Sequence, residues 1–152
     1  MDYINLEIDF IDRTLKAIRQ YERFLKENQN EEAFDVTMYI NSLTGLIIFP
    51  KENGFLKKFL PNDRIEEWYL GGSVKDDTIL TIKDLAIQLR HCIAHADFEF
   101  GSDNERQIDK VIFKDTKEKK GVIAEFRIDD FKSFIELISE AMIENARKRN
   151  SI

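Results

Sequence analysis

Hydrophobic residues recur every three or four positions along four segments of the chain, which is typical of helices that bury one face. The predicted helices span residues 3–28, 31–48, 81–95 and 129–148. The hydrophobic positions of the third helix fall on one narrow face, and we expect that face to lie in the core. These positions are Ile82, Leu85, Ala86, Leu89, Ile93 and Ala96.

Polar residues mark several ends of these helices. Asn30 and Asp129 are candidate N-caps of the second and last helices, because their side chains can accept a backbone N–H. Pro50 ends the second helix, since proline lacks the N–H that a helix interior needs. The first helix carries a second hydrophobic row beside its main one, so we expect it to bury two flanks. That row comprises Phe10, Ala17, Tyr21 and Phe24. In the second helix, the predicted buried row includes Ala33.

The pattern changes from helical to alternating between the third and last helices. Residues 98–100, 110–113 and 122–128 alternate, and the charged residues 115–121 separate the last two segments. This pattern predicts a small antiparallel β-hairpin or meander before the last helix. Residues 51–78 lack periodicity, and we expect short helical turns and loops there, with Trp68 and Tyr69 as core anchors. The predicted fold class is mainly α, a helical bundle with this β insertion.

Composition narrows the possible classes of protein. A chain of 152 residues with 43% hydrophobic residues is expected to form one domain, residues 1–152. Its net charge of −6 disfavours non-specific adhesion to DNA or anionic lipid, so any contact with nucleic acid must be local. The single cysteine excludes an intrachain disulfide and cysteine-rich zinc modules. No apolar run approaches the ~18 residues of a membrane span, and the acidic start resembles no export signal, so we expect a cytoplasmic protein without membrane contact.

Both histidines of the chain lie near the end of the third helix, within the segment from Arg90 to His95. His91 and His95 point away from the predicted core face, together with Asp84 and Gln88. The apolar Ile87 projects from this polar side, which suggests that another helix or another subunit covers it.

A histidine and an arginine together suit metal-independent RNA cleavage. Imidazole titrates near neutral pH and can act as general acid or base toward the ribose 2′-OH or the leaving oxygen. A guanidinium stays charged and can stabilise charge on the phosphate oxygens. His95 and Arg90 provide these groups, although their directions differ by about 140° around the helix. Two copies related by a two-fold axis could bring them into one cleft.

Three other interpretations of the segment remain open. Arginine and histidine are favoured near a helix C-terminus by the helix dipole alone, without any function. His91 and His95 could bind one metal ion together, but a third ligand is not obvious, with Asp84 and Asp97 as possibilities. Cys92 could be a nucleophile, but a single cysteine is more typical of a small apolar core residue.

Two blocks of the sequence resemble the HEPN superfamily, whose name abbreviates higher eukaryotes and prokaryotes nucleotide-binding. Arg90 and His95 match its Arg-x4–6-His motif. Residues 34–50 are similar to the second-helix block of a bacterial, partly plasmid-borne HEPN branch. Residues 89–95 correspond to its Leu-Arg-Asn-x-Ile-Ala-His segment, with His91 in place of the usual asparagine. The resemblance extends over nearly the whole chain.

The resemblance implies an up-and-down helical bundle that forms a homodimer through the motif helices. It also implies a metal-independent endoribonuclease of a toxin–antitoxin or phage-defence system, which leaves a 2′,3′-cyclic phosphate. Arg90 would bind the scissile phosphate, His95 would be the general acid/base, and His91 would add a polar side chain. The implied partners are RNA, a second copy and an antitoxin protein, with no cofactor and no metal. Some relatives are inactive, so a non-catalytic module that binds a protein partner or a nucleotide is the alternative.

Overall fold

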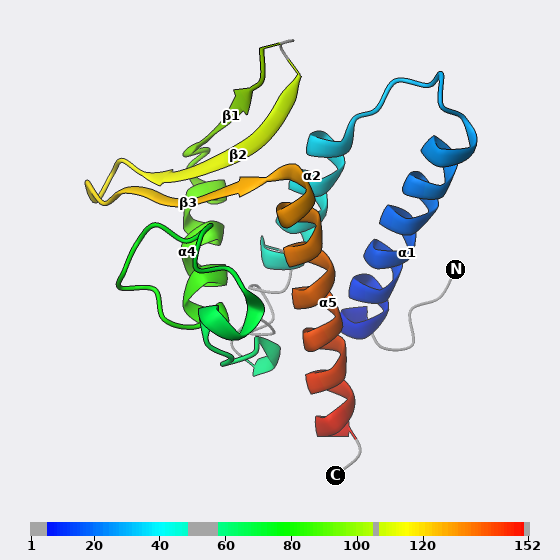
Figure 1. The fold of residues 1–152 in the computed structure, drawn as a ribbon. Helices are drawn as coiled ribbons and strands as arrows, with labels where there is room; N and C mark the ends of the chain where they lie inside the picture. The colour runs from blue at the N-terminus through cyan, green and yellow to red at the C-terminus, as the bar shows by residue number, and fades with distance from the viewer. Residues whose placement is uncertain (1–5, 49–57, 105–106, 151–152) are drawn as a thin grey trace.

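The structure of this chain is a computed structural model that describes residues 6–48, 58–104 and 107–150. Helices account for most of these residues, and an antiparallel sheet for a smaller part (Figure 1). The mainly α fold class is therefore confirmed. The helical elements are α1 (Leu6–Glu27), α2 (Asp35–Ile48), the 3-10 helix η2 (Ile65–Trp68), α4 (Ile82–Ala94) and α5 (Ile128–Asn150). Among the described residues, none of the helices combines the length and the apolar character needed to cross a bilayer.

The sheet consists of three strands in the order β1-β2-β3, with both pairs antiparallel. The strands are β1 (Phe98–Ser102), β2 (Ile108–Asp115) and β3 (Gly121–Arg127). The predicted β insertion is thus a three-stranded meander, because residues 98–102 pair along β2 instead of leaving a two-stranded hairpin. In this register Phe98 lies opposite Phe113, and Val111 lies opposite Phe126. Figure 1 shows the sheet crossing one end of the helices, beside the start of α5.

The starts of two helices differ from their predictions. Helix α2 begins at Asp35, not Glu31, and Asn30 lies in a turn instead of capping it. The physical reason is a contact between helices, because the Phe34 N–H donates to the Tyr21 hydroxyl of α1 and keeps the preceding residues in a loop. Helix α5 begins at Ile128, so Asp129 lies in its first turn. Its charge there interacts favourably with the helix dipole, but it is not the predicted N-cap.

The second hydrophobic row of α1 is only partly buried, so the predicted second flank is confirmed only in part. Phe10 and Tyr21 are half-buried. Ala17 is exposed and Phe24 is 50% exposed. Ala33, predicted in the buried row of α2, lies before the helix and is also exposed. Helix α1 contacts α2 and α5, and the row that meets them is the one that is buried. That row contains Ile11, Leu15 and Ile18.

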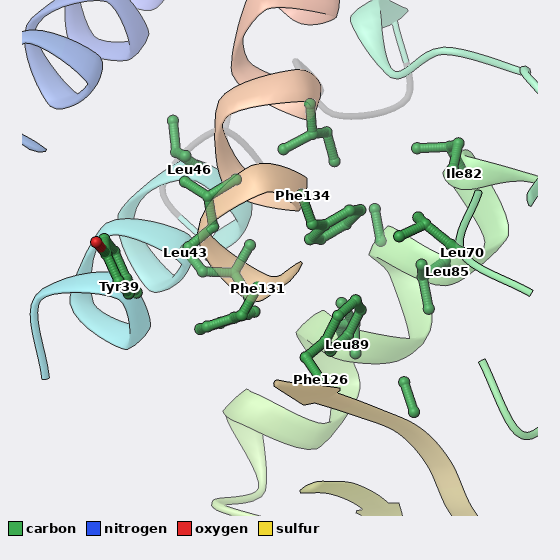
Figure 2. Close-up of a cluster of buried hydrophobic side chains, with 14 of the residues drawn as sticks. Tyr39, Leu43, Leu46, Leu70, Ile82, Leu85, Leu89, Phe126, Phe131 and Phe134 are labelled. Carbon is green, nitrogen blue, oxygen red and sulfur yellow. The ribbon is translucent and has the colours of Figure 1, made fainter. Parts of the chain in front are cut away.

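The core lies between α5, the sheet and the inner faces of α2 and α4. Phe131 and Phe134 of α5 are fully buried, and their ring centroids lie 5.6 Å and 5.4 Å from that of Phe126 in β3. Figure 2 shows these rings among leucines that come from both α2 and α4. Trp68 is a partly buried anchor, with its ring centroid 6.4 Å from that of Phe134. Tyr69 is 94% exposed, so it is not the predicted anchor; it closes η2 at φ 58° and its side chain faces solvent.

Glu22 links three helices across the surface of the bundle. Its Oε1 accepts the Tyr39 hydroxyl of α2 at 2.9 Å and lies 2.8 Å from the Lys132 ammonium of α5. Burial, together with the bond to Glu22, raises the pKa of Tyr39 above its ordinary value. The Lys132 ammonium donates a hydrogen bond to Glu22, and this bond raises the pKa of Lys132. Both shifts indicate that the protonated donors are held against this carboxylate.

Replacing Glu22 by alanine should therefore destabilise the bundle. We expect Glu22→Ala to lower the free energy of unfolding by about 1–2 kcal/mol, because two donors lose their acceptor at a partly buried site. Urea unfolding followed by circular dichroism measures the change. Glu144→Ala is the matched control, because it removes only the exposed pair of Glu144 with Lys148 and should cost less than about 0.5 kcal/mol. Equal costs for the two variants would contradict this role of Glu22.

Candidate functional site

Helix α4 carries the predicted site, and its core face lies largely where the pattern predicts. Its side chains Ile82, Leu85, Ala86 and Leu89 are buried. The helix starts after Thr81, whose side chain accepts the Asp84 N–H at 3.1 Å. Ala96 is exposed because it follows the end of the helix, so its place in the buried row was a wrong prediction.

Helix α4 ends in a Schellman motif without glycine. The Asp97 N–H donates to the Cys92 carbonyl at 2.7 Å, and the Ala96 N–H donates to the Ile93 carbonyl at 3.0 Å. Ala96 lies at φ 51°, in the left-handed region that this motif needs and that glycine usually occupies. His95 is the C-cap, so its side chain projects from the last helical position.

Asp97 then joins the end of α4 to the end of β2. Its carbonyl accepts the Lys114 N–H at 3.0 Å. Its carboxylate Oδ2 accepts both the N–H and the hydroxyl of Thr116, at 2.7 and 2.9 Å. The backbone hydrogen bond from Thr116 is the main cause that holds the pKa of Asp97 below its ordinary value. The sequence suggested the Asp97 carboxylate as a metal ligand. In the structure this carboxylate binds Thr116 instead and holds the turn after β2 beside α4.

Arg90, His91 and His95 line one hollow of about 300 Å³ on the outer side of α4. The remaining lining residues are Ile87, Gln88, Ala94 and Glu118. Arg90 and His91 are half-buried, and His95 is exposed. Despite their divergent directions around the helix, the three predicted site residues therefore border the same hollow within one copy of the chain.

The polar atoms around this hollow do not all have hydrogen-bond partners within the described part of the chain. Arg90 Nε and His91 Nε2 are buried and have no hydrogen-bond partner among the described residues. The imidazole rings of His91 and His95 meet edge to face, with centroids 4.5 Å apart. Glu118 brings a carboxylate to the hollow, and it is paired with Lys120 at 3.1 Å. Unpaired buried polar atoms are rare in proteins and are typical of sites where a ligand completes their interactions.

Cys92 belongs to the core, as is typical of a single cysteine. It is 1% exposed, and burial, followed by the nearby charge of Asp115, raises the pKa of its thiol to about 12. A nucleophilic cysteine needs a thiolate, so this side chain is a packed apolar residue and not a nucleophile.

Neither of the third metal ligands that the sequence suggested for His91 and His95 completes a site with them. Asp84 is exposed in the first turn of α4, and Asp97 is bound to Thr116. Among the described residues, the group of potential ligands that includes His91 is instead completed by Asp115 and Glu118, with donor atoms all within 4.8 Å of one another. The sequence reasoning missed both, because residues 115–121 read as a charged turn in solvent. The one available signal was the alternation of β2, which gives Asp115 the same face as the buried Phe113.

A family model described as HEPN pEK499 p136 matches residues 1–149 of the chain. The matched region includes α4, the sheet and every residue that lines the hollow. No curated protein and no solved structure matches the chain.

The Schellman motif predicts that glycine is better than alanine at position 96. We expect Ala96→Gly to raise the free energy of unfolding by about 0.5–1 kcal/mol, because glycine adopts positive φ without the steric cost of a Cβ. Ala94→Gly, two residues earlier and within the helix, should lower it by about 0.5–1 kcal/mol. Urea unfolding of the two variants measures both changes. A loss of stability in both variants would show that the backbone at Ala96 is not strained.

Proposed function

This chain belongs to the HEPN pEK499 p136 family, a plasmid-associated family of the HEPN superfamily, and we propose that it is a metal-independent endoribonuclease. The observation that carries the proposal is the hollow beside α4, which Arg90, His91 and His95 line together. The superfamily includes many ribonucleases of toxin–antitoxin and phage-defence systems. We place this protein in such a system, with RNA as substrate, an antitoxin protein as partner and the cytoplasm as its location.

The proposed reaction is an internal transfer at one phosphodiester of RNA. The ribose 2′-oxygen attacks phosphorus, the bond to the 5′-oxygen breaks, and the 5′-oxygen receives a proton, which leaves a 2′,3′-cyclic phosphate and a 5′-hydroxyl. His95 is the exposed imidazole at the hollow, and in this scheme it moves the proton. Arg90 has a buried Nε without a partner among the described residues, and it would donate to a phosphate oxygen as charge develops there.

His91 has a supporting role in this scheme. Its ring lies edge to face against His95, and its Nε2 is buried, so the ring is less accessible to RNA than that of His95. We propose that His91 limits the orientations of His95 and adds a polar side chain to the hollow. The pairing of Glu118 with Lys120 supports the scheme, because it offsets a carboxylate that would otherwise repel phosphate.

The proposal includes a homodimer through α4, within the up-and-down arrangement of helices that the family implies. Ile87 is 39% exposed and lines the hollow next to Arg90 and His95. An apolar side chain on an otherwise polar helix face supports a second copy there. A two-fold axis beside Ile87 would place two hollows against each other and enlarge the surface available to RNA.

A non-catalytic module is the second candidate function. The observation that favours it is Glu118, whose carboxylate lines the same hollow as the proposed phosphate-binding Arg90. In that case the hollow would bind a basic or amide-bearing group of a protein partner, and no RNA would be cut.

Substitution of the two proposed catalytic residues tests the nuclease directly. With chelator present throughout, we expect wild-type protein to cut RNA and leave cyclic phosphate ends. His95→Ala and Arg90→Ala should each cut at least ~100-fold more slowly, the usual scale for a lost proton-transfer group or charge-stabilising donor. Gel analysis of end-labelled RNA measures the rates. Arg64→Ala is the control, because Arg64 is exposed and pairs with Glu66 away from the hollow. If wild type and all three variants cut RNA at the same rate, His95 and Arg90 are not the catalytic residues.

The dimer is tested by placing a charge on the outer face of α4. Ile87→Glu should weaken self-association by at least about tenfold, or 1.4 kcal/mol, because the two-fold axis would bury two unpaired carboxylates. Analytical ultracentrifugation measures the dissociation constant. Leu137→Glu is the matched control, since Leu137 is 43% exposed on α5. A wild-type protein that stays monomeric, or a larger effect of Leu137→Glu, would rule out this interface.

A further inference from the structure

We propose that His91, Asp115 and Glu118 bind a divalent first-row transition-metal ion, of which Zn²⁺ is the representative. The three residues come from α4, from the end of β2 and from the turn that follows it. One donor atom of each lies within 4.8 Å of the others. The family resemblance implies no metal, and the sequence suggested only a His91–His95 site, whereas this set of ligands comes from the fold. The inference does not depend on the proposed nuclease.

Asp115 is the strongest indication of a ligand. It is 1% exposed, so its carboxylate is removed from water. Its Oδ1 accepts the Glu118 N–H at 2.9 Å, but its Oδ2 is buried without a hydrogen-bond partner among the described residues. An unpaired buried carboxylate oxygen is costly, and a bound cation removes that cost.

His91, another member of the cluster, also has an unpaired buried atom. Its Nε2 is buried and has no hydrogen-bond partner among the described residues. A neutral imidazole presents a lone pair there, which is the usual protein donor to zinc. Two residues of this cluster thus each carry an unpaired buried atom, which is typical of a site that binds a ligand.

The geometry suits a small ion after a modest movement of Glu118. Ligands about 2.1 Å from a tetrahedral ion lie about 3.4 Å from one another, which is within the observed limit of 4.8 Å. Glu118 is exposed and sits on a turn, so its side chain can rotate to close the distance. It pairs with Lys120 through one oxygen, which leaves the other for an ion. The fourth position would open into the hollow and hold water.

The donor set also selects the class of ion. One imidazole nitrogen favours zinc and its neighbours over calcium and magnesium, which prefer oxygen ligands alone. Two carboxylates balance the charge of a divalent ion. The guanidinium of Arg90 borders the same hollow, so it disfavours an ion of higher charge.

Direct binding of Zn²⁺ to the full chain, without RNA, tests the proposal. Calorimetry should show one ion per chain, and Co²⁺ should give the visible absorption of a tetrahedral site. Asp115→Asn, Glu118→Gln and His91→Gln should each weaken binding by more than the ~10–100-fold that loss of an outer partner costs. Asp84→Asn is the control carboxylate on α4, and His95→Gln is the control imidazole; both should bind Zn²⁺ like wild type.

Several outcomes would overturn the site. These include a wild-type chain that binds no Zn²⁺ and wild-type affinity in Glu118→Gln. Loss of binding in His95→Gln, with wild-type affinity in Asp115→Asn, would also overturn it, because that result would indicate a His91–His95 pair. Asp115→Asn keeps an acceptor for the Glu118 N–H, and if it still fails to fold, the exposed Glu118→Gln decides the question. Because RNA cleavage is measured in chelator and Zn²⁺ binding without RNA, failure of one proposal leaves the other intact.

Discussion

The hollow beside α4 depends on how Asp97 holds the end of that helix. Its N–H closes the Schellman motif on the Cys92 carbonyl, and its carbonyl and carboxylate bind Lys114 and Thr116 at the end of β2. A single residue thus fixes the last turn of α4 against the sheet. The direction of His95 and the distance from His91 to the β2–β3 turn both follow from this attachment.

A strained backbone conformation and several buried polar atoms, each of which costs free energy, lie at the end of α4 and around the hollow. Ala96 adopts positive φ, a conformation that costs an alanine roughly 1 kcal/mol. Arg90, His91 and Asp115 each bury a polar atom without a partner among the described residues, at about 1–3 kcal/mol for each such group. The Phe126, Phe131 and Phe134 cluster and the rest of the core must offset these costs. Polar groups that the protein itself leaves unsatisfied are typical of sites that bind something else.

Side chains of both charges lie at and around the hollow, although the chain as a whole has a net charge of −6. Arg90 and Lys120 favour an anion, whereas Asp115 and Glu118 favour a cation. The two proposed ligands would bind in different parts of this region, the phosphate near Arg90 and His95 and the ion near Asp115 and Glu118. His91 takes part in both, since its ring contacts His95 and one of its ring nitrogens lies within the ligand cluster.

Hydrophobic periodicity by itself determined the existence of the helices and the extent of α4 to within one residue at each end. The family came instead from the resemblance of residues 34–50 and 89–95 to HEPN proteins, which the family model bears out. Periodicity succeeded because burial of one helix face is a local property of the sequence. The start of α2 required the Tyr21 hydroxyl to bind the Phe34 N–H, and the exposure of Phe24 required knowledge of which side of α1 meets α2 and α5. The sequence also indicated Arg90, His91 and His95, which share one helix. Only the tertiary structure decided that Asp115 and Glu118 join them, because strand pairing and the Asp97 attachment bring together residues that no local pattern connects.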